Sequence, residues 1–351
     1  MNKLRRSIAA GLAAAPFAQT QSRTAPEFHG ARIGQGKFRY RVDKLWSQAD
    51  TERFPVKDCH EMIQAADGRL FLLTNQARNN VLIYEASGKL LDTWTLSFGG
   101  AHGLSIHREA DGKEFLYITD TGSGRVVKTT LAGEIVMELV HPQRCGAYSA
   151  MDIYSPTETA VGPNGDVYVA DGYGSQFILR YDRSGVYKGK FGGKSSQPIS
   201  KGKFLQAHGV AIDTRGAVPL VLCTARIRNE FHWFSLEGEH QRTVYLPGAY
   251  LSRPVLAGRY LYSGICFGMF RDDYRMWQNR GFVTILDDQD RVVSNPGGHA
   301  PEYKDGRLQL LLQDQAVFRN CHDVCVDKQE DLYVCQWNSG NVYPYKLHRE
   351  G

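Results

Sequence analysis

Short apolar runs, many of them alternating or β-branched, recur along most of the chain and are separated by polar turns that contain Asp and Gly. The unit that starts at Ala101 has an apolar strand, a polar turn, a second run rich in Tyr and Val, and then a third run. Turn strings such as DG, PNG and DRSG between such runs predict antiparallel hairpins. Helical heptads are absent. The pattern therefore indicates an all-β chain built from small antiparallel sheets.

Six copies of this unit follow one another, and the fifth is degenerate and interrupted by an insertion at 268–280. The copies start at Cys59, Ala101, Pro156, Ala207, Ser252 and Cys321. Because a single copy cannot bury its faces alone, the copies must pack around an axis, which predicts one six-bladed β-propeller over 38–347. The last copy has only three strands, so the stretch Phe38–Trp46 is expected to supply its outer strand and close the ring.

Composition and charge narrow the choice of partners. The chain has 351 residues, 42% of them hydrophobic, and a net charge of +5 with basic and acidic residues interspersed. This length allows one large core, and the absence of basic runs argues against nucleic acid as a partner. Seven cysteines leave at least one unpaired. A bridge between Cys325 and Cys335, on successive strands of one hairpin, is conceivable, but buried free thiols are favoured.

The N-terminus reads MNKLRRSIAAGLAAAPFAQTQS, with Arg5 and Arg6 ahead of an alanine-rich stretch. This arrangement predicts an export signal over 1–22 of the twin-arginine type, and hence a periplasmic or secreted protein. An amphipathic N-terminal helix is the alternative. No later stretch is long enough to span a bilayer, so no integral membrane segment is expected in the mature chain.

Alignment of the copies brings six residues to one position near the start of the innermost strand. These residues are His60, His102, Thr157, His208, Arg253 and His322. Innermost strands run along the propeller axis, so these side chains should ring the channel mouth. His102, His208 and His322 come from alternate blades, and three imidazoles with an open position are typical of catalytic zinc. For a single histidine, satisfying backbone groups is the simpler explanation.

Further candidates surround this ring. His60 either supports a metal ligand or contacts substrate, and Arg253 either binds an anion or pairs with a nearby carboxylate. Tyr173 follows the second strand of the third blade, where a phenol beside a metal can act as a base, although a lone tyrosine is more often packing. Asp323, next to His322, could bind a hard cation or orient the imidazole.

The copies resemble NHL repeats, and the stretch 99–347 resembles the peptidyl-α-hydroxyglycine α-amidating lyase family. The resemblance rests on HGLSI, PTETAV followed by YVADGYG, GKFLQAHGVAI and CHDVCVD. It implies a catalytic zinc on His102, His208 and His322, with Tyr173 as the catalytic tyrosine. It also implies a structural calcium ion on Asp323 and the Leu104 carbonyl, and a functional arginine at Arg226.

The chain departs from that family at two places. Gly174 stands where the family has a cysteine in a disulfide, and Lys57 aligns with a catalytic arginine. A lysine cannot reproduce bidentate carboxylate binding. The resemblance thus implies a zinc-dependent lyase that splits a hydroxyglycine-like substrate into an amide and glyoxylate. Lys57, Arg226 or Arg253 would hold the substrate carboxylate.

Two other functions remain open on the sequence. One is a non-catalytic NHL propeller that binds a peptide or a partner protein on its loop face. The other is a metal-dependent lactonase of the gluconolactonase kind, whose calcium ligands are carboxylate and amide oxygens rather than histidines. If the chain is an enzyme, lyase or lactonase, its partner is a small-molecule or peptide substrate. A monomer is expected.

Overall fold

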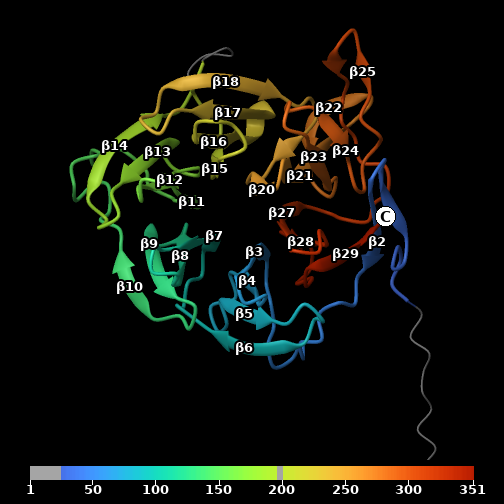
Figure 1. Cartoon of the computed structure of the whole chain (residues 1–351), viewed down its shortest axis with the longest axis horizontal. Helices are drawn as coiled ribbons and strands as arrows, with labels where there is room; N and C mark the ends of the chain where they lie inside the picture. Colours follow the sequence, from blue (N-terminus) through green and yellow to red (C-terminus); the bar gives the residue numbers. More distant parts are fainter. Residues whose placement is uncertain (1–24, 196–200) are drawn as a thin grey trace, which may run out of the picture.

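The computed structural model describes residues 25–195 and 201–351. Six of the seven antiparallel sheets that these residues form are arranged around a central axis, and the seventh has two strands (Figure 1). Blade 1 contains β3 (Cys59–Gln64), β4 (Leu70–Thr74), β5 (Val81–Tyr84) and β6 (Leu90–Trp94). Blade 2 contains β7 (Ala101–Arg108), β8 (Glu114–Asp120), β9 (Arg125–Thr130) and β10 (Ile135–Glu138). Blade 3 contains β11 (Glu158–Val161), β12 (Val167–Ala170), β13 (Phe177–Tyr181) and β14 (Tyr187–Gly192).

The other three blades complete the ring. Blade 4 contains β15 (Ala207–Asp213), β16 (Leu220–Ala225), β17 (Glu230–Phe234) and β18 (His240–Tyr245), with the short helix η1 (Arg226–Arg228) after β16. Blade 5 contains β19 (Tyr250–Leu251), β20 (Val255–Ala257), β21 (Tyr260–Phe270), β23 (Phe282–Leu286) and β24 (Val292–Ser294). Blade 6 contains β27 (Cys321–Val326), β28 (Leu332–Gln336) and β29 (Tyr345–Glu350). The predicted six-bladed propeller is confirmed.

The N-terminal segment closes the ring, as the strand count of the last copy predicts. β2 (Phe38–Asp43) pairs antiparallel with β29, with Val42 opposite Leu347, and β1 (Arg32–Gln35) pairs with β2. Blade 6 thereby joins the two ends of the described chain in one sheet of order β1-β2-β29-β28-β27. The outer edge of this sheet is β1, which is only four residues long, so few backbone N–H and C=O groups are left unpaired there.

The core lies between neighbouring blades. The middle strands β4 and β5 are buried along their whole length, whereas the outer strand β6 is mostly exposed or half-buried. Adjacent blades cover both faces of a middle strand, so runs such as LFLLT and VLIY read as continuous apolar stretches rather than alternating ones. This packing fixes the radial position of each innermost strand.

Two smaller features bear on earlier predictions. The insertion at 268–280 forms a hairpin, because β21 extends beyond blade 5 and pairs with β22 (Asp273–Trp277). A second short hairpin, β25 (Tyr303–Lys304) with β26 (Arg307–Leu308), follows blade 5.

All seven cysteines lie in the described residues and are free thiols, six of them buried, as favoured from the sequence.

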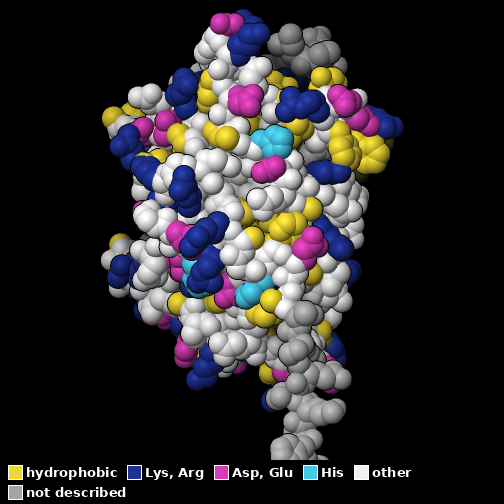
Figure 2. All heavy atoms as spheres, turned by 90° about the vertical axis from the view of Figure 1, so that its right-hand side faces the viewer, with side chains coloured by type: hydrophobic (Ala, Val, Ile, Leu, Met, Phe, Trp, Pro, Cys, Tyr) yellow, Lys and Arg dark blue, Asp and Glu magenta, His cyan; other side chains and the backbone are white. Residues whose placement is uncertain are grey.

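The predicted export signal at 1–22 lies outside the described residues. Among the described residues, no helix has the length and apolar character needed to cross a membrane. On the face seen in Figure 2, Lys and Arg side chains alternate with Asp and Glu and form no continuous basic patch.

Candidate functional site

Bulges at the start of four innermost strands turn histidines into the channel. In β3 the ladder steps from Cys59 to Glu61, and in β27 it steps from Cys321 to Asp323, so that the histidine between them is unpaired with the second strand. β7 and β15 show the same shift at their His-Gly pairs. A bulge frees one residue from the ladder and re-aims its side chain. The bulges explain why these particular residues face the axis.

The four imidazoles from blades 1, 2, 4 and 6 form one buried cluster. Their ring centroids are separated by 4.6 Å for His60–His102 and His60–His322, 4.8 Å for His102–His208 and His102–His322, and 4.9 Å for His208–His322. Each is at most 5% exposed. The ligand nitrogens of His60, His102 and His322 all lie within 4.8 Å of one another. This group of three imidazoles could hold a metal ion, and it contains His60 in place of the predicted ligand His208. The His208 ring nevertheless lies in the same cluster, 4.8 Å from His102 and 4.9 Å from His322.

Backbone carbonyls orient two of the rings. His102 Nδ1 lies 2.8 Å from the Thr157 carbonyl oxygen, and His322 Nδ1 lies 3.0 Å from the His60 carbonyl oxygen. A carbonyl can only accept, so both Nδ1 atoms carry the proton and both Nε2 atoms keep a lone pair. Such a hydrogen bond is what fixes tautomer and ring direction in metal-binding histidines. Thr157, predicted as a channel-mouth residue, therefore acts through its backbone.

Three imidazole nitrogens in the cluster are buried without a hydrogen-bond partner, namely His60 Nδ1, His208 Nδ1 and His322 Nε2. Orphaned polar atoms are costly unless a ligand or ion satisfies them. Burial also lowers the pKa of all four imidazoles, that of His60 to about 3 with Arg226 and Lys57 adding to the effect. The rings are therefore neutral near pH 7, the form that binds metals. These residues fit a bound divalent metal.

Tyr173 completes the cluster. Its hydroxyl lies 3.1 Å from His102 Nε2 and 3.1 Å from His208 Nε2, so the predicted tyrosine and two predicted ligands meet at one point. The residue as a whole is 41% exposed, which places its ring at the mouth and its hydroxyl inward. Burial raises the pKa of Tyr173, and the neighbouring Arg226 guanidinium lowers it.

A buried carboxylate holds the Tyr173 loop where the resemblance would place a disulfide. Asp171 accepts hydrogen bonds from Ser155 N at 2.7 Å, Ser175 N at 2.7 Å and the Tyr148 hydroxyl at 2.7 Å. Gly174 lies against this carboxylate, since a Cβ there would stand 2.1 Å from Asp171 Oδ1. The loop is therefore built around Asp171, and no side chain fits at 174.

Arg226 and Lys57 occupy different positions at the site. Arg226 is 2% exposed, and its guanidinium donates to the Leu251 carbonyl at 2.9 Å and to Ser252 Oγ at 3.2 Å. It also lies 5.8 Å from the Phe267 ring, which packs with Trp337 in an apolar wall. Lys57 is exposed and close enough to lower the pKa of His60. Arg226 is thus fixed at the cluster, while Lys57 lies at the rim.

The contacts of the Arg253 side chain do not fit two of the predictions. Its Nε donates to Asp323 Oδ1 at 2.7 Å and its Nη1 donates to the Leu104 carbonyl at 2.7 Å, so the two proposed calcium ligands face a guanidinium. A calcium ion needs six to eight oxygens of its own, and these are already used. The calcium prediction therefore does not fit the structure. The same contacts leave Arg253 unavailable to a substrate carboxylate, and of its two alternatives pairing with a carboxylate is the correct one.

Sequence reasoning missed two buried acids of this layer, Glu61 and Glu158, each 1% exposed. The signal lay one column further along the same alignment. Glu61 follows His60, Glu158 follows Thr157, and Asp323 follows His322, so three copies carry an acid at that position. It also missed Asp171, which is part of the DGY motif and holds the loop by accepting hydrogen bonds from backbone N–H groups.

Comparison with known proteins finds relatives of part of the sequence and solved structures with the same fold. No protein-family model matches the chain. NHL repeat-containing protein 3 of Homo sapiens is 24% identical over 192 residues, 52% of this chain and 53% of that protein. A Caenorhabditis elegans protein named as a probable peptidyl-alpha-hydroxyglycine alpha-amidating lyase is 38% identical over 85 residues, 24% of this chain and 23% of that protein. The matches thus span about half and about a quarter of these relatives.

Solved structures with the same architecture include a streptogramin B lyase, with a TM-score of 0.53 and 12% identity over 89% of this chain and 98% of that one. A gluconolactonase from Xanthomonas campestris has a TM-score of 0.56 and 14% identity over 89% of this chain and 90% of that one. At such identities the likeness shows the fold alone. The chain is a six-bladed β-propeller that resembles NHL repeat-containing proteins and, over a shorter stretch, a peptidyl-α-hydroxyglycine α-amidating lyase.

Proposed function

We propose that the chain is a metal-dependent lyase that breaks the carbinolamide C–N bond of a peptidyl-α-hydroxyglycine-like substrate and releases an amide and glyoxylate. One observation carries the proposal. The Tyr173 hydroxyl lies 3.1 Å from Nε2 of both His102 and His208, inside a buried cluster of neutral imidazoles. A group able to move a proton and a set of metal ligands therefore meet at one point. The nematode relative named as such a lyase supports the same reaction class.

Zinc is the metal we propose, held by His102, His208 and His322. The buried nitrogens without a partner, His208 Nδ1 and His322 Nε2, support a ligand at this place. His60 lies 4.6 Å from two of these rings and is a fourth candidate ligand. All-imidazole ligand sets suit zinc rather than calcium. When bound, the metal supplies a Lewis acid that polarises a substrate oxygen.

The reaction needs two proton movements that the chain itself can serve. The substrate hydroxyl loses its proton as its carbon becomes a carbonyl, the C–N bond breaks, and the amide nitrogen takes up a proton. Tyr173 is the proposed acceptor of the hydroxyl proton, which it then returns to the amide nitrogen as the C–N bond breaks. Burial opposes its ionisation by raising its pKa, whereas the charge of Arg226 and a hydrogen bond from it favour the phenolate. Arg226 therefore tunes the base.

The substrate carboxylate is proposed to meet Arg226. This guanidinium is buried beside Tyr173 and is positioned by the Leu251 carbonyl and Ser252 Oγ. Planar donors of this kind match a carboxylate better than an ammonium group does. Lys57, exposed at the rim, is the second candidate for that contact. We further propose that the protein acts as a monomer after export, on a small-molecule or peptide substrate that enters past Tyr173.

The test compares purified wild-type protein with His208→Ala and with His107→Ala, a control on the same strand as His102 but further along it. The wild type and the control should contain one metal ion per chain and should release glyoxylate from an N-acyl-α-hydroxyglycine. His208→Ala should lose both. Wild-type protein without metal, or an active and metal-loaded His208→Ala, would overturn the proposal. Bound metal with no glyoxylate release would favour a binding propeller of the NHL kind.

A further inference from the structure

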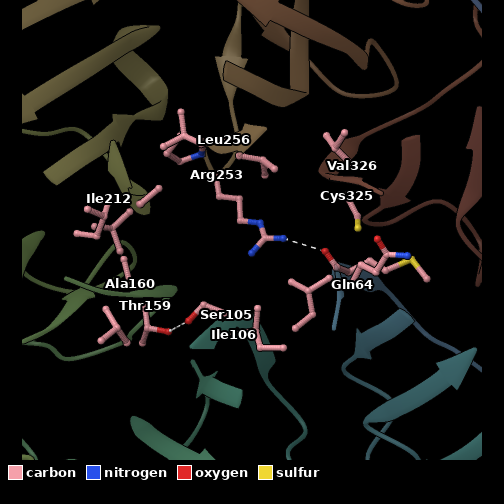
Figure 3. Close-up of a pocket in the computed structure, with 17 residues that line it drawn as sticks. Gln64, Ser105, Ile106, Thr159, Ala160, Ile212, Arg253, Leu256, Cys325 and Val326 are labelled. Atoms are coloured by element: carbon pink, nitrogen blue, oxygen red, sulfur yellow. Dashed lines mark hydrogen bonds between the residues drawn. The ribbon is translucent and has the colours of Figure 1, made fainter. Parts of the chain in front are cut away.

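A single guanidinium lies at the centre of the channel, one layer beyond the imidazoles. Arg253 starts on blade 5, in the inner-strand position that carries histidine in four other blades, and reaches across the middle of the ring toward the blades of Gln64 and Ser105 (Figure 3). It is 7% exposed. A long cation in this position has contacts available from every direction around the axis.

Arg253 uses that position to contact four other blades through its side chain. Its Nε and Nη2 donate to the two Asp323 carboxylate oxygens at 2.7 and 3.0 Å. Nη1 donates to the Leu104 carbonyl at 2.7 Å, and Nη2 donates to the Met62 carbonyl at 2.9 Å. Nη1 also lies 3.3 Å from Glu61 Oε2.

The remaining contacts bring in the other two blades. Arg253 Nη1 lies 3.8 Å from Glu158 Oε2 of blade 3. On blade 4, a Cβ added to Gly209 would stand 2.5 Å from the Arg253 Cα, so the two inner strands approach closely only because position 209 is glycine. All six blades therefore meet at this residue.

The buried acids of this layer favour a cation beside them. Glu61, Glu158 and Asp323 are each at most 1% exposed, and buried carboxylates without a partner are strongly unfavourable. Carboxylates together with backbone carbonyls converging on one point are the ligand set of a hard divalent ion. Here the oxygens of Asp323, Leu104, Met62 and Glu61 surround a guanidinium at 2.7–3.3 Å.

We propose that Arg253 is a tethered cation that takes the place of a divalent ion in the channel and ties the six blades together. It also divides the channel. A cavity of about 310 Å³ beyond it is lined by Arg253 and mainly apolar side chains but by none of the four imidazoles. Ligands then reach the imidazoles only from the face that carries Tyr173. This inference stands apart from the proposed lyase activity, since it concerns a different set of ligands.

Calcium titration of the full-length wild-type protein is the first test, performed both with zinc added and without it. With Arg253 in place, millimolar calcium should shift Tm by less than about 1 °C, and dialysed protein should retain no calcium. One calcium ion per chain, or a rise of about 5 °C as expected for a ligand well above its Kd, would overturn the proposal. The zinc content does not enter this result, so a failure of the proposed metal site is distinguishable.

The variant Arg253→Ala supplies the converse test. It exposes the converging oxygens, so its Tm should fall without calcium and should recover by about 5 °C or more when calcium is added. The control Arg259→Ala removes an exposed arginine of the same blade and should show neither effect. An unchanged Tm for Arg253→Ala with no response to calcium would refute the assignment. If this variant does not fold, the wild-type titration decides.

Discussion

Substitution of Gly174 by Ala tests how the Tyr173 loop is positioned. A Cβ at 174 would lie 2.1 Å from Asp171 Oδ1 and 2.4 Å from the Ile153 carbonyl oxygen. Neither neighbour can yield freely, because Ser155 N donates to that carboxylate oxygen at 2.7 Å and Ser175 N donates to the Ile153 carbonyl at 2.9 Å. The added methyl group must therefore displace the loop backbone itself.

The expected cost follows from overpacking a closed site, about 1–3 kcal/mol. For a domain of about 300 residues that corresponds to a fall in Tm of roughly 2–5 °C. The displaced loop also carries the Tyr173 hydroxyl away from His102 and His208. A misplacement of about 1 Å at a reacting group can lower turnover by about 10²-fold. Metal content should remain unchanged, since no ligand nitrogen belongs to this loop.

Thermal unfolding, glyoxylate release and elemental analysis measure these three effects. The matched control is Gly189→Ala on β14, where an added Cβ meets nothing within 4 Å and the backbone is not left-handed. The control should keep the wild-type Tm within about 1 °C or gain slightly, since alanine restricts the unfolded chain. Equal Tm and equal activity for Gly174→Ala and Gly189→Ala would refute the reasoning.

Three further outcomes follow from the same geometry. Tyr173→Phe should bind metal at the wild-type stoichiometry but release glyoxylate about 10²-fold more slowly or worse, as single-turnover kinetics can show; unchanged turnover would exclude Tyr173 as the base. Zinc-free protein should lose stability as the pH falls from 6.5 toward about 3, because burial lowers the pKa of His60 to about 3 and the unfolded chain then binds more protons. Denaturant titrations should show roughly 1.4 kcal/mol per pH unit for each such imidazole, and a flat profile would contradict the buried neutral cluster. Leu347→Ala, at the closure of the ring, should cost about 2–5 kcal/mol of unfolding free energy, whereas the exposed Arg39→Ala on β2 should change it by less than about 0.5; equal effects would argue against closure by β2.

The repeat pattern predicted most of the fold. Short apolar runs and the turns between them place the blades, and the missing strand of the last copy places Phe38–Asp43 beside β29. Alignment of the copies also places His60, His102, His208 and His322 in one ring, because an inner strand fixes the same radial position in each blade. These predictions depend only on backbone geometry that every copy shares.

The layer around Arg253 could not be predicted in the same way. Alignment gives the position of its Cα on the inner strand but says nothing of where a long flexible side chain ends. Its guanidinium extends past the imidazoles and contacts acids at the next position of the repeat alignment, including Glu61 and Asp323. The resemblance to a calcium-containing family then pointed to an ion where the chain supplies its own cation.

The loop of Tyr173 shows a second limit. The DGY motif gave the residue, but Asp171 and Gly174 hold the loop through hydrogen bonds to backbone N–H groups and through a close approach. Such contacts depend on how the 149–156 segment folds against the loop, which no periodic pattern encodes. The structure shows that the absence of a cysteine at 174 does not leave the loop without support.

Metal stoichiometry of the purified full-length protein tests the central claim most directly. The imidazole cluster predicts one zinc ion per chain after dialysis against zinc-containing buffer, lost in His102→Ala and His322→Ala and retained in His107→Ala. Calcium should be absent from all four proteins, because the Arg253 guanidinium lies among the buried carboxylates of the channel, those of Glu61, Glu158 and Asp323. Wild-type protein that binds no metal, or histidine variants that bind zinc as the wild type does, would contradict the account.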